Sequence, residues 1–254
     1  MKTLTLSALA LFANLGGCGT EEPRGKAAPA NAIANEIAKQ DRVREAHSIP
    51  ERVWDAFEAA TGHRSNFGAI EEGYVVATRP ARIVELPFGP ALLTEVEIEQ
   101  GCHGCVGAIG VYYLKRVGDG FQVKGRWPRA IEGWTFGLPP TDWHLTDRFT
   151  GYPAIYATGG FLAQGITTAG ATITELRPTG PVESAPIGTY YDDEGDPETK
   201  RAPCKVEGRI ANVRKDRSFD VVVSGSVEAI DRYAMKGGRF VARSQIRWND
   251  PCHG

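Results

Sequence analysis

From about residue 68 onward, short apolar or alternating segments recur between the turn residues Gly, Pro and Asp, and this pattern limits the fold more than any other feature. Alternation with a period of two is typical of β-strands that bury one face. The segments show no fixed repeat length, so neither a propeller nor a solenoid is expected. The pattern therefore predicts antiparallel sheet as the main structure of the chain.

Two pairs of segments predict β-hairpins. AIGVYYL and FQVKGR flank KRVGDG, and SFDVVVSGSV closely follows KVEGRIANV. In SFDVVVSGSV, the residues Phe219, Val221 and Val223 alternate with other residues, which predicts that these three face a core. Further strands are predicted in the segments YVVAT, ARIVEL, PAIYA, FLAQGITT, ATITEL and RFVARSQIRW.

Two stripes of apolar residues at helical spacing precede the β region. The first spans residues 33–38, and the second contains Val53, Trp54 and Phe57, with Gly62 placed to end its helix. We therefore predict an α+β fold, mainly antiparallel β-sheet as a sandwich or a partly open barrel, with a short N-terminal helical region at 31–62. Residues 31–254 are expected to form a single β-rich globular domain.

The first eighteen residues predict export from the cytoplasm. Lys2 precedes the apolar run LTLSALALFANL, which is too short to span a bilayer, so residues 1–17 are interpreted as a cleavable signal peptide. Leu15-Gly16-Gly17-Cys18 resembles the lipobox of bacterial lipoprotein precursors, and the resemblance is limited to residues 1–18. An ordinary signal peptide with an incidental cysteine is the alternative.

The lipobox resemblance implies where the mature protein lies. Cys18 would be lipidated and become the new N-terminus, and Gly19 in place of Asp implies the outer membrane, facing the periplasm. The membrane is then a partner through the lipid on Cys18. Residues 19–30 contain no bulky apolar residue, so residues 18–30 are expected to be the lipidated cysteine and a flexible tether.

Charge and cysteine content restrict partners and chemistry. The chain has a net charge of −2, and loss of Lys2 with the signal leaves it slightly more negative, so nucleic acid is not expected as a partner. Besides Cys18, four cysteines remain in an oxidising compartment, which predicts two disulfides among Cys102, Cys105, Cys204 and Cys252. Three pairings are possible, and pairing of sequence neighbours is the simplest.

The motif GCHGC at 101–105 has a second interpretation as a redox site. Thiol-disulfide exchange would use Cys102 as the attacking thiol and Cys105 as the resolving thiol. That chemistry usually places the first cysteine at a helix N-terminus, whereas VGAIGVYYL after Cys105 favours a strand. A structural disulfide is therefore the favoured interpretation, and a four-cysteine zinc site is disfavoured because Cys204 and Cys252 lie far apart in the sequence.

Residues 126–153 are predicted to form a long ordered loop rich in aromatic residues. Aromatic rings on such a loop can bind a glycan or an envelope protein, but they can also fill space against the sheet. The candidate ligand-binding residues are Trp127, Trp134, Phe136, Trp143, His144, Arg148 and Tyr152.

The segment YDDEGDPE at 191–198 holds the densest group of carboxylates. Such oxygens suit calcium, but the EF-hand order is absent, so an exposed acidic turn is the favoured interpretation and no metal is expected. The residues of the weaker calcium hypothesis are Asp192, Asp193, Glu194, Asp196 and Glu198.

Two functional hypotheses from different classes remain. The first is a lipid-anchored envelope protein that acts as a non-catalytic binding or structural module and needs no cofactor. The second is an exported thiol-disulfide oxidoreductase that uses Cys102 and Cys105. The ligand and the oligomeric state stay open at this stage.

Overall fold

The computed structural model describes residues 49–71, 73–99, 104–134, 136–195, 202–243 and 246–252. The predicted signal peptide, Cys18, the tether and the first predicted helix lie outside these residues. The described residues all belong to one unit that begins at Ile49.

Helix α2 (Glu51–Thr61) confirms the second predicted helix. It begins after Pro50, whose carbonyl accepts a hydrogen bond from the Val53 N–H at 2.8 Å. It ends at Gly62, which adopts a left-handed conformation (φ +83°) and donates its N–H to the Glu58 carbonyl at 2.7 Å. The buried face of the helix consists of Val53, Ala56, Phe57 and Ala60.

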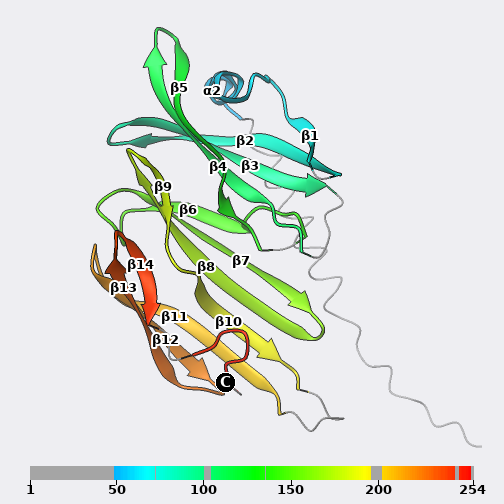
Figure 1. Cartoon of the computed structure of the whole chain (residues 1–254), viewed down its shortest axis with the longest axis vertical. Coiled ribbons are helices and arrows are strands. Elements are labelled where there is room, and N and C mark those ends of the chain that lie inside the picture. Colours follow the sequence, from blue (N-terminus) through cyan, green and yellow to red (C-terminus); the bar gives the residue numbers. More distant parts are fainter. Residues whose placement is uncertain are drawn as a thin grey trace, which may run out of the picture. The chain divides into compact units, whose positions relative to one another are not determined.

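The first sheet is an antiparallel meander of five strands that follow one another in sequence order. Helix α2 lies on one face of this sheet (Figure 1), where Phe57 packs in one apolar cluster with Leu92 and Tyr112. The strands are β1 (Phe67–Glu71), β2 (Tyr74–Leu86), β3 (Gly89–Glu99), β4 (Ala108–Val117) and β5 (Gly120–Glu132).

The second sheet is larger and also antiparallel, in the order β14-β13-β12-β11-β10-β8-β7-β6, with β9 paired to β8. Both predicted hairpins are confirmed, as β4–β5 and β11–β12. The strands are β6 (Asp142–Thr146), β7 (Ala154–Ala163), β8 (Ile166–Arg177), β9 (Gly180–Glu183), β10 (Ile187–Asp193), β11 (Cys204–Arg214), β12 (Ser218–Gly225), β13 (Ala229–Lys236) and β14 (Arg239–Arg243).

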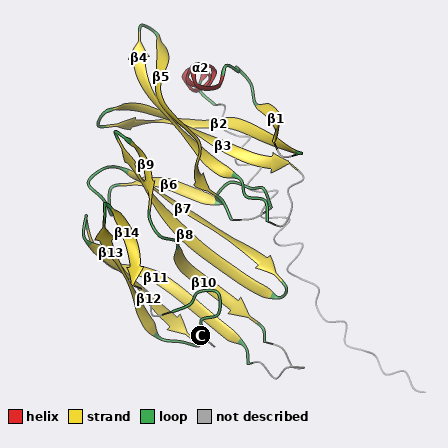
Figure 2. Cartoon of the chain, viewed as in Figure 1, coloured by secondary structure: helices red, strands yellow, loops and turns green. Residues whose placement is uncertain are grey.

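The two sheets pack against each other. Leu93 and Val111 of the first sheet share an apolar cluster with Ile155 and Leu176 of the second sheet. The first sheet is thus covered by α2 on one face and by β6–β8 on the other (Figure 2). This arrangement confirms the predicted α+β fold dominated by antiparallel sheet.

The second sheet curls around a core of its own. Phe219, Val221 and Val223 face this core, as predicted, together with Tyr233 and Phe240. The curl brings β14 back to the connection between β9 and β10, where the Ala185 N–H donates to the Phe240 carbonyl at 3.0 Å. The sheet is therefore a half-barrel, the partly open barrel among the predicted alternatives.

The C-terminal segment 246–252 belongs to the core of this curled sheet. Ile246 is buried there, and Trp248 and Cys252 pack against the same cluster. Cys252 forms a disulfide with Cys204 at the start of β11, with 6.1 Å between the two Cα atoms. The disulfide therefore ties the end of the chain to the inside of the sheet.

Glycines on neighbouring strands make room for two tryptophan rings. Gly159 and Gly170 are paired across β7 and β8, and a Cβ on either residue would lie within 2.5 Å of the Trp134 ring. Gly188 on β10 is the next glycine in this row, and a Cβ there would lie 1.9 Å from the ring of Trp248. Only glycine allows these close approaches of ring to backbone.

Candidate functional site

The aromatic residues of 126–153 do not lie on one long loop, so this prediction is wrong. Trp127 belongs to β5, which runs to Glu132, and Trp143 and His144 belong to β6. Two register shifts let β5 remain paired with β4 in spite of the Gly and Pro residues that suggested a loop. Loop structure is limited to the segments on either side of β6.

Two of the predicted binding residues act mainly in packing. Trp134 lies over the paired Gly159 and Gly170, as described above. Trp143 is half-buried, with the Arg82 guanidinium 4.2 Å from its ring centroid and its Nε1 donating to Glu95 Oε1 at 3.2 Å. The alternative prediction, in which the rings fill space against the sheets, describes both residues.

Three other predicted residues are exposed at separate places. Phe136 lies on the loop after β5. The ring centroids of His144 and Tyr156 are 5.4 Å apart, and the Arg148 guanidinium lies over the ring of Phe149. The three residues come from three different segments, namely the loop after β5, strand β6 and the segment after β6.

Trp127 and Tyr152 do come together, through residues that the sequence analysis missed. Ring centroids lie 4.8 Å apart between Trp127 and Tyr113, 5.0 Å between Tyr113 and Phe88, and 6.5 Å between Phe88 and Tyr152. We call these four residues the aromatic row. It connects β5, β4, the β2–β3 turn and the segment before β7.

Phe88 and Tyr113 of the aromatic row line an open cleft of about 500 Å³. This volume lies within the range of small-molecule sites, and the lining is mainly apolar. We call it the apolar cleft. Its lining residues are Phe88, Gly89, Pro90, Tyr113, Leu114, Lys115, Arg116, Lys124 and Pro178.

Positive charge surrounds the apolar cleft. Arg116 pairs with Glu85, whereas Lys115 and Lys124 form no ion pair with any described residue. Burial raises the pKa of Tyr113 above its usual range, so this side chain stays neutral at the base of the cleft. The cleft thus combines an apolar floor with two available ammonium groups.

The sequence offered few signals for this site. Phe88 and Pro90 stand in a tight turn, and Tyr113 stands inside a continuous apolar run, where burial in a core is the ordinary expectation. Their convergence depends on the pairing of β2 with β3 and β3 with β4, which sequence spacing does not reveal.

Both partners of one disulfide lie among the described residues. Cys204–Cys252 is a disulfide, in agreement with the simplest pairing of the predicted set. Cys105 is also disulfide-bonded and is 9% exposed, while Cys102 lies outside the described residues. The chain passes from Cys105 into strand β4 at Ala108, so no helix follows the motif.

The acidic residues of 191–195 make contacts within the protein. Asp192 accepts a hydrogen bond from the Tyr190 hydroxyl at 2.6 Å, and Asp193 is buried and accepts the Gly195 N–H at 2.8 Å. Glu194 is exposed, and Asp196 and Glu198 lie outside the described residues. In the described ranges, no group of three His, Cys, Asp or Glu side chains is placed to hold a metal ion.

Comparison with known proteins adds no assignment: no family model, curated protein or solved structure matches the chain. Among the residues that the structure describes, none of the helices combines the length and the apolar character needed to cross a membrane.

Proposed function

We propose that the protein is a lipid-anchored component of the bacterial cell envelope whose β-rich part binds a ligand without catalysing a reaction. The lipobox-like sequence ending at Cys18 and the apolar run before it support the anchor and an outer-membrane location facing the periplasm. The tether at 19–30 would separate the lipid from the folded part. An envelope protein or a glycan is a further possible partner in this compartment.

The observation that carries the binding role is the apolar cleft. Its volume of about 500 Å³ and its mainly apolar lining are those of a small-molecule site. Lys115 and Lys124 stand at its rim without ion-pair partners among the described residues. A ligand with an apolar body and one anionic end satisfies both features, because its apolar body would be buried in the cleft and its anionic end would pair with a lysine at the rim.

Titration calorimetry with decanoate tests this proposal. We expect decanoate to bind and decanol to bind at least tenfold more weakly, because decanol lacks the charge that pairs with the lysines. Pro178→Trp places a large ring in the cleft and is expected to abolish binding. Asp119→Trp, at the turn of the β4–β5 hairpin, is the matched control, and equal binding by both variants would contradict the site.

The anchor has a separate test. Mass spectrometry of the mature N-terminal peptide is expected to show acyl chains on Cys18. Cys18→Ala should release the protein from washed membranes, whereas an unmodified N-terminus at another residue would favour the ordinary signal peptide.

The oxidoreductase alternative rests on Cys102 and Cys105. An exchange site needs an accessible disulfide, whereas Cys105 is buried and is followed by strand β4. Peptide mapping of the disulfides with and without a mild thiol reductant separates the hypotheses. Selective reduction of a 102–105 bond would support exchange, and resistance to reduction would support a structural disulfide.

A further inference from the structure

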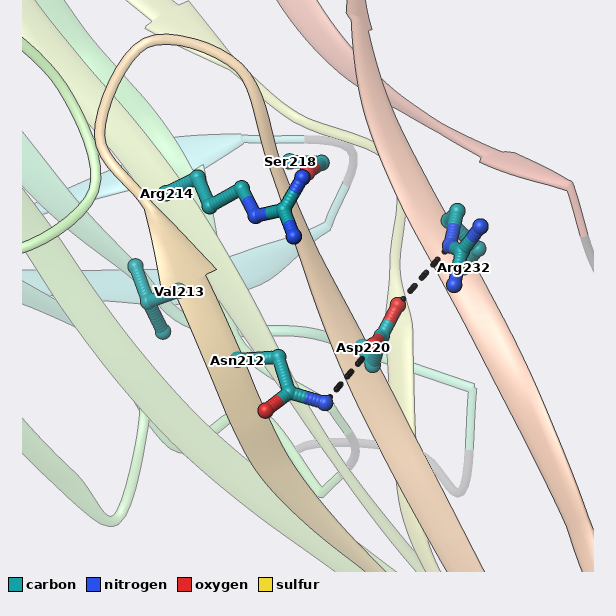
Figure 3. Close-up of a pocket in the computed structure, with 6 residues that line it drawn as sticks. All are labelled: Asn212, Val213, Arg214, Ser218, Asp220 and Arg232. Carbon is teal, nitrogen blue, oxygen red and sulfur yellow. Dashed lines mark hydrogen bonds and ion pairs between the residues drawn. The ribbon is translucent and has the colours of Figure 1, made fainter.

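A second cleft lies on the outer face of the half-barrel, at the β11–β12 hairpin. Its volume is also about 500 Å³, but its lining is polar. We call it the polar cleft. Figure 3 shows the six residues that line it: Asn212, Val213, Arg214, Ser218, Asp220 and Arg232.

Strand register brings the charged residues of the polar cleft together. Ser218 and Asp220 alternate with the core residues Phe219 and Val221, so they point away from the core. Asp220 is paired with Arg232 on β13, and Ser218 is paired with Arg214 on β11. Three neighbouring strands thus contribute side chains to one surface.

An irregularity in β11 shapes the cleft. The pairing of β11 with β12 shifts between Ala211 and Arg214, and Asn212 within this bulge has a left-handed backbone (φ +50°). Asparagine tolerates that conformation better than most residues. The bulge lets the Asn212 Nδ2 reach Asp220 Oδ2 at 2.9 Å.

The Asp220 carboxylate holds Arg232 in position and is not available to bind a cation. Its Oδ1 accepts the Arg232 Nε–H at 3.0 Å, and its Oδ2 accepts from Asn212. The Asp220 side chain is 11% exposed, whereas that of Arg232 is 63% exposed. Both carboxylate oxygens are therefore engaged, while the two terminal nitrogens of the exposed Arg232 side chain donate no hydrogen bond to any residue that the structure describes.

Arg214 supplies a second guanidinium. Within the described part of the chain it donates no side-chain hydrogen bond, and in Figure 3 its head lies beside Ser218. Its positive charge and that of Arg232 both help to lower the pKa of Asp220 below the usual range, an effect led by the Asn212 hydrogen bond. Arg243 on β14 is paired with Arg232 on β13, so a further arginine lies on the strand next to the cleft.

We propose that the polar cleft binds a phosphate ester of a polar, sugar-like molecule through Arg214, Arg232 and Ser218. Guanidinium groups bind phosphate oxygens through paired N–H donors, and the Ser218 hydroxyl adds a third donor. Asp220 acts as a positioning residue that holds Arg232 by its Nε. Val213 is the one apolar side chain of the lining, which favours a polar body over an acyl chain.

Titration calorimetry at low salt tests this site with three probes: glucose 6-phosphate, inorganic phosphate and glucose. Glucose 6-phosphate is expected to bind best, and Arg214→Gln should weaken it at least tenfold. Arg209→Gln is the matched control, because Arg209 is an exposed arginine on β11 outside the cleft, and it should change binding less than twofold.

The role of Asp220 gives an independent measurement. Asp220→Asn keeps the shape but weakens the hold on Arg232, so it should reduce affinity for glucose 6-phosphate several-fold while the Arg209→Gln control stays unchanged. Equal binding of inorganic phosphate and glucose 6-phosphate would show an oxyanion site that does not recognise the sugar body. This result would overturn the proposal that the ligand is a phosphate ester. Binding of glucose as tight as that of its phosphate, or no binding of any probe, would overturn the site.

Discussion

The Nε1 of Trp248 donates a hydrogen bond to Oδ2 of Asp231 at 3.1 Å, which joins the C-terminal segment to the inner side of β13. Asp231 is fully buried, and a buried carboxylate is costly without hydrogen-bond donors. A Cβ on Gly188 would lie 1.9 Å from the Trp248 ring, and a Cβ on Gly208 would lie 2.8 Å from it. The C-terminal segment is therefore part of the half-barrel's core and not an appendage.

Trp248→Phe is expected to lower the free energy of unfolding by about 1–3 kcal/mol, because it removes a donor from the buried Asp231 while keeping most of the ring. Urea denaturation measures the change. Trp54→Phe on α2 is the control, since the Trp54 indole donates no hydrogen bond in the described part of the chain. Equal losses in the two variants would contradict a special role for the Trp248–Asp231 bond.

Removal of the Cys204–Cys252 disulfide by a double substitution to Ala is expected to lower the free energy of unfolding by about 4 kcal/mol. The bond closes a loop between residues 48 apart, and the entropy of such a loop in the unfolded chain sets this magnitude. Each single substitution should have a similar effect, measured by denaturation of freshly purified, non-reduced protein. A loss below about 1 kcal/mol would show that the packing of Trp248 holds the segment without the bond.

Much of the fold could be predicted from the sequence because the strongest local signals agree with it. The alternation of Phe219, Val221 and Val223 gave the buried face of β12, and Gly62 marked the end of α2. The prediction for segment 126–153 was wrong because both tryptophans stand in strands. Trp127 lies in β5, whose Gly125 and Pro128 are typical of a loop, and Trp143 lies in the short strand β6, which follows Pro139 and Pro140. The local composition of this segment favours a loop, but pairing with neighbouring strands makes β5 and β6 extended.

The candidate sites were harder to predict than the strands. Trp127 and Tyr152 were identified as aromatic candidates, but the floor of the apolar cleft comes from Phe88 and Tyr113, which no local motif links to them. The polar cleft depends on a bulge at Asn212 and on the register of three strands. Such features are set by long-range pairing, so sequence spacing alone does not contain them.

Tyr113 and Tyr233 form a matched pair for substitution by Phe. The Tyr233 hydroxyl donates to the Pro186 carbonyl at 2.8 Å, whereas the buried Tyr113 hydroxyl has no hydrogen-bond partner within the described residues. Tyr233→Phe should therefore lower the free energy of unfolding by about 1 kcal/mol, and Tyr113→Phe should raise it by about the same amount. Thermal and urea unfolding at pH 7 give both values, and changes of the same sign would contradict the assignment.

Alkaline pH should reveal the same burial. Burial raises the pKa of both Tyr113 and Tyr233 above the usual value of about 10. The folded state therefore resists ionisation, so stability is complete below about pH 10 and declines as the pH rises above it, where the unfolded chain ionises. Tyr113→Phe should reduce this decline between about pH 9 and 11, and an unchanged alkaline profile would be contrary evidence.

Acid pH should report on Asp220. The hydrogen bond from Asn212, followed by the hydrogen bond and the charge of Arg232, holds the pKa of Asp220 below the usual value of about 4. A lowered pKa means that the carboxylate stabilises the fold above about pH 4, and that this contribution is lost as the pH falls through the folded-state pKa. Asp220→Asn should therefore flatten the acid decline, whereas Asp119→Asn, in an exposed turn, should leave it unchanged in urea midpoints measured from about pH 5 to 2.

Gly159→Ala should destabilise the protein by about 1–3 kcal/mol, because the new Cβ would lie 1.7 Å from Cδ1 of Trp134 and the ring would have to move. Gly120→Ala is the control, since the nearest atom to its Cβ would be 3.9 Å away. The cause can be isolated in a Trp134→Ala background, where the collision is absent. There, Gly159→Ala should cost much less than in the wild-type protein, and an unchanged cost would assign the effect to the backbone of β7 instead of the Trp134 ring.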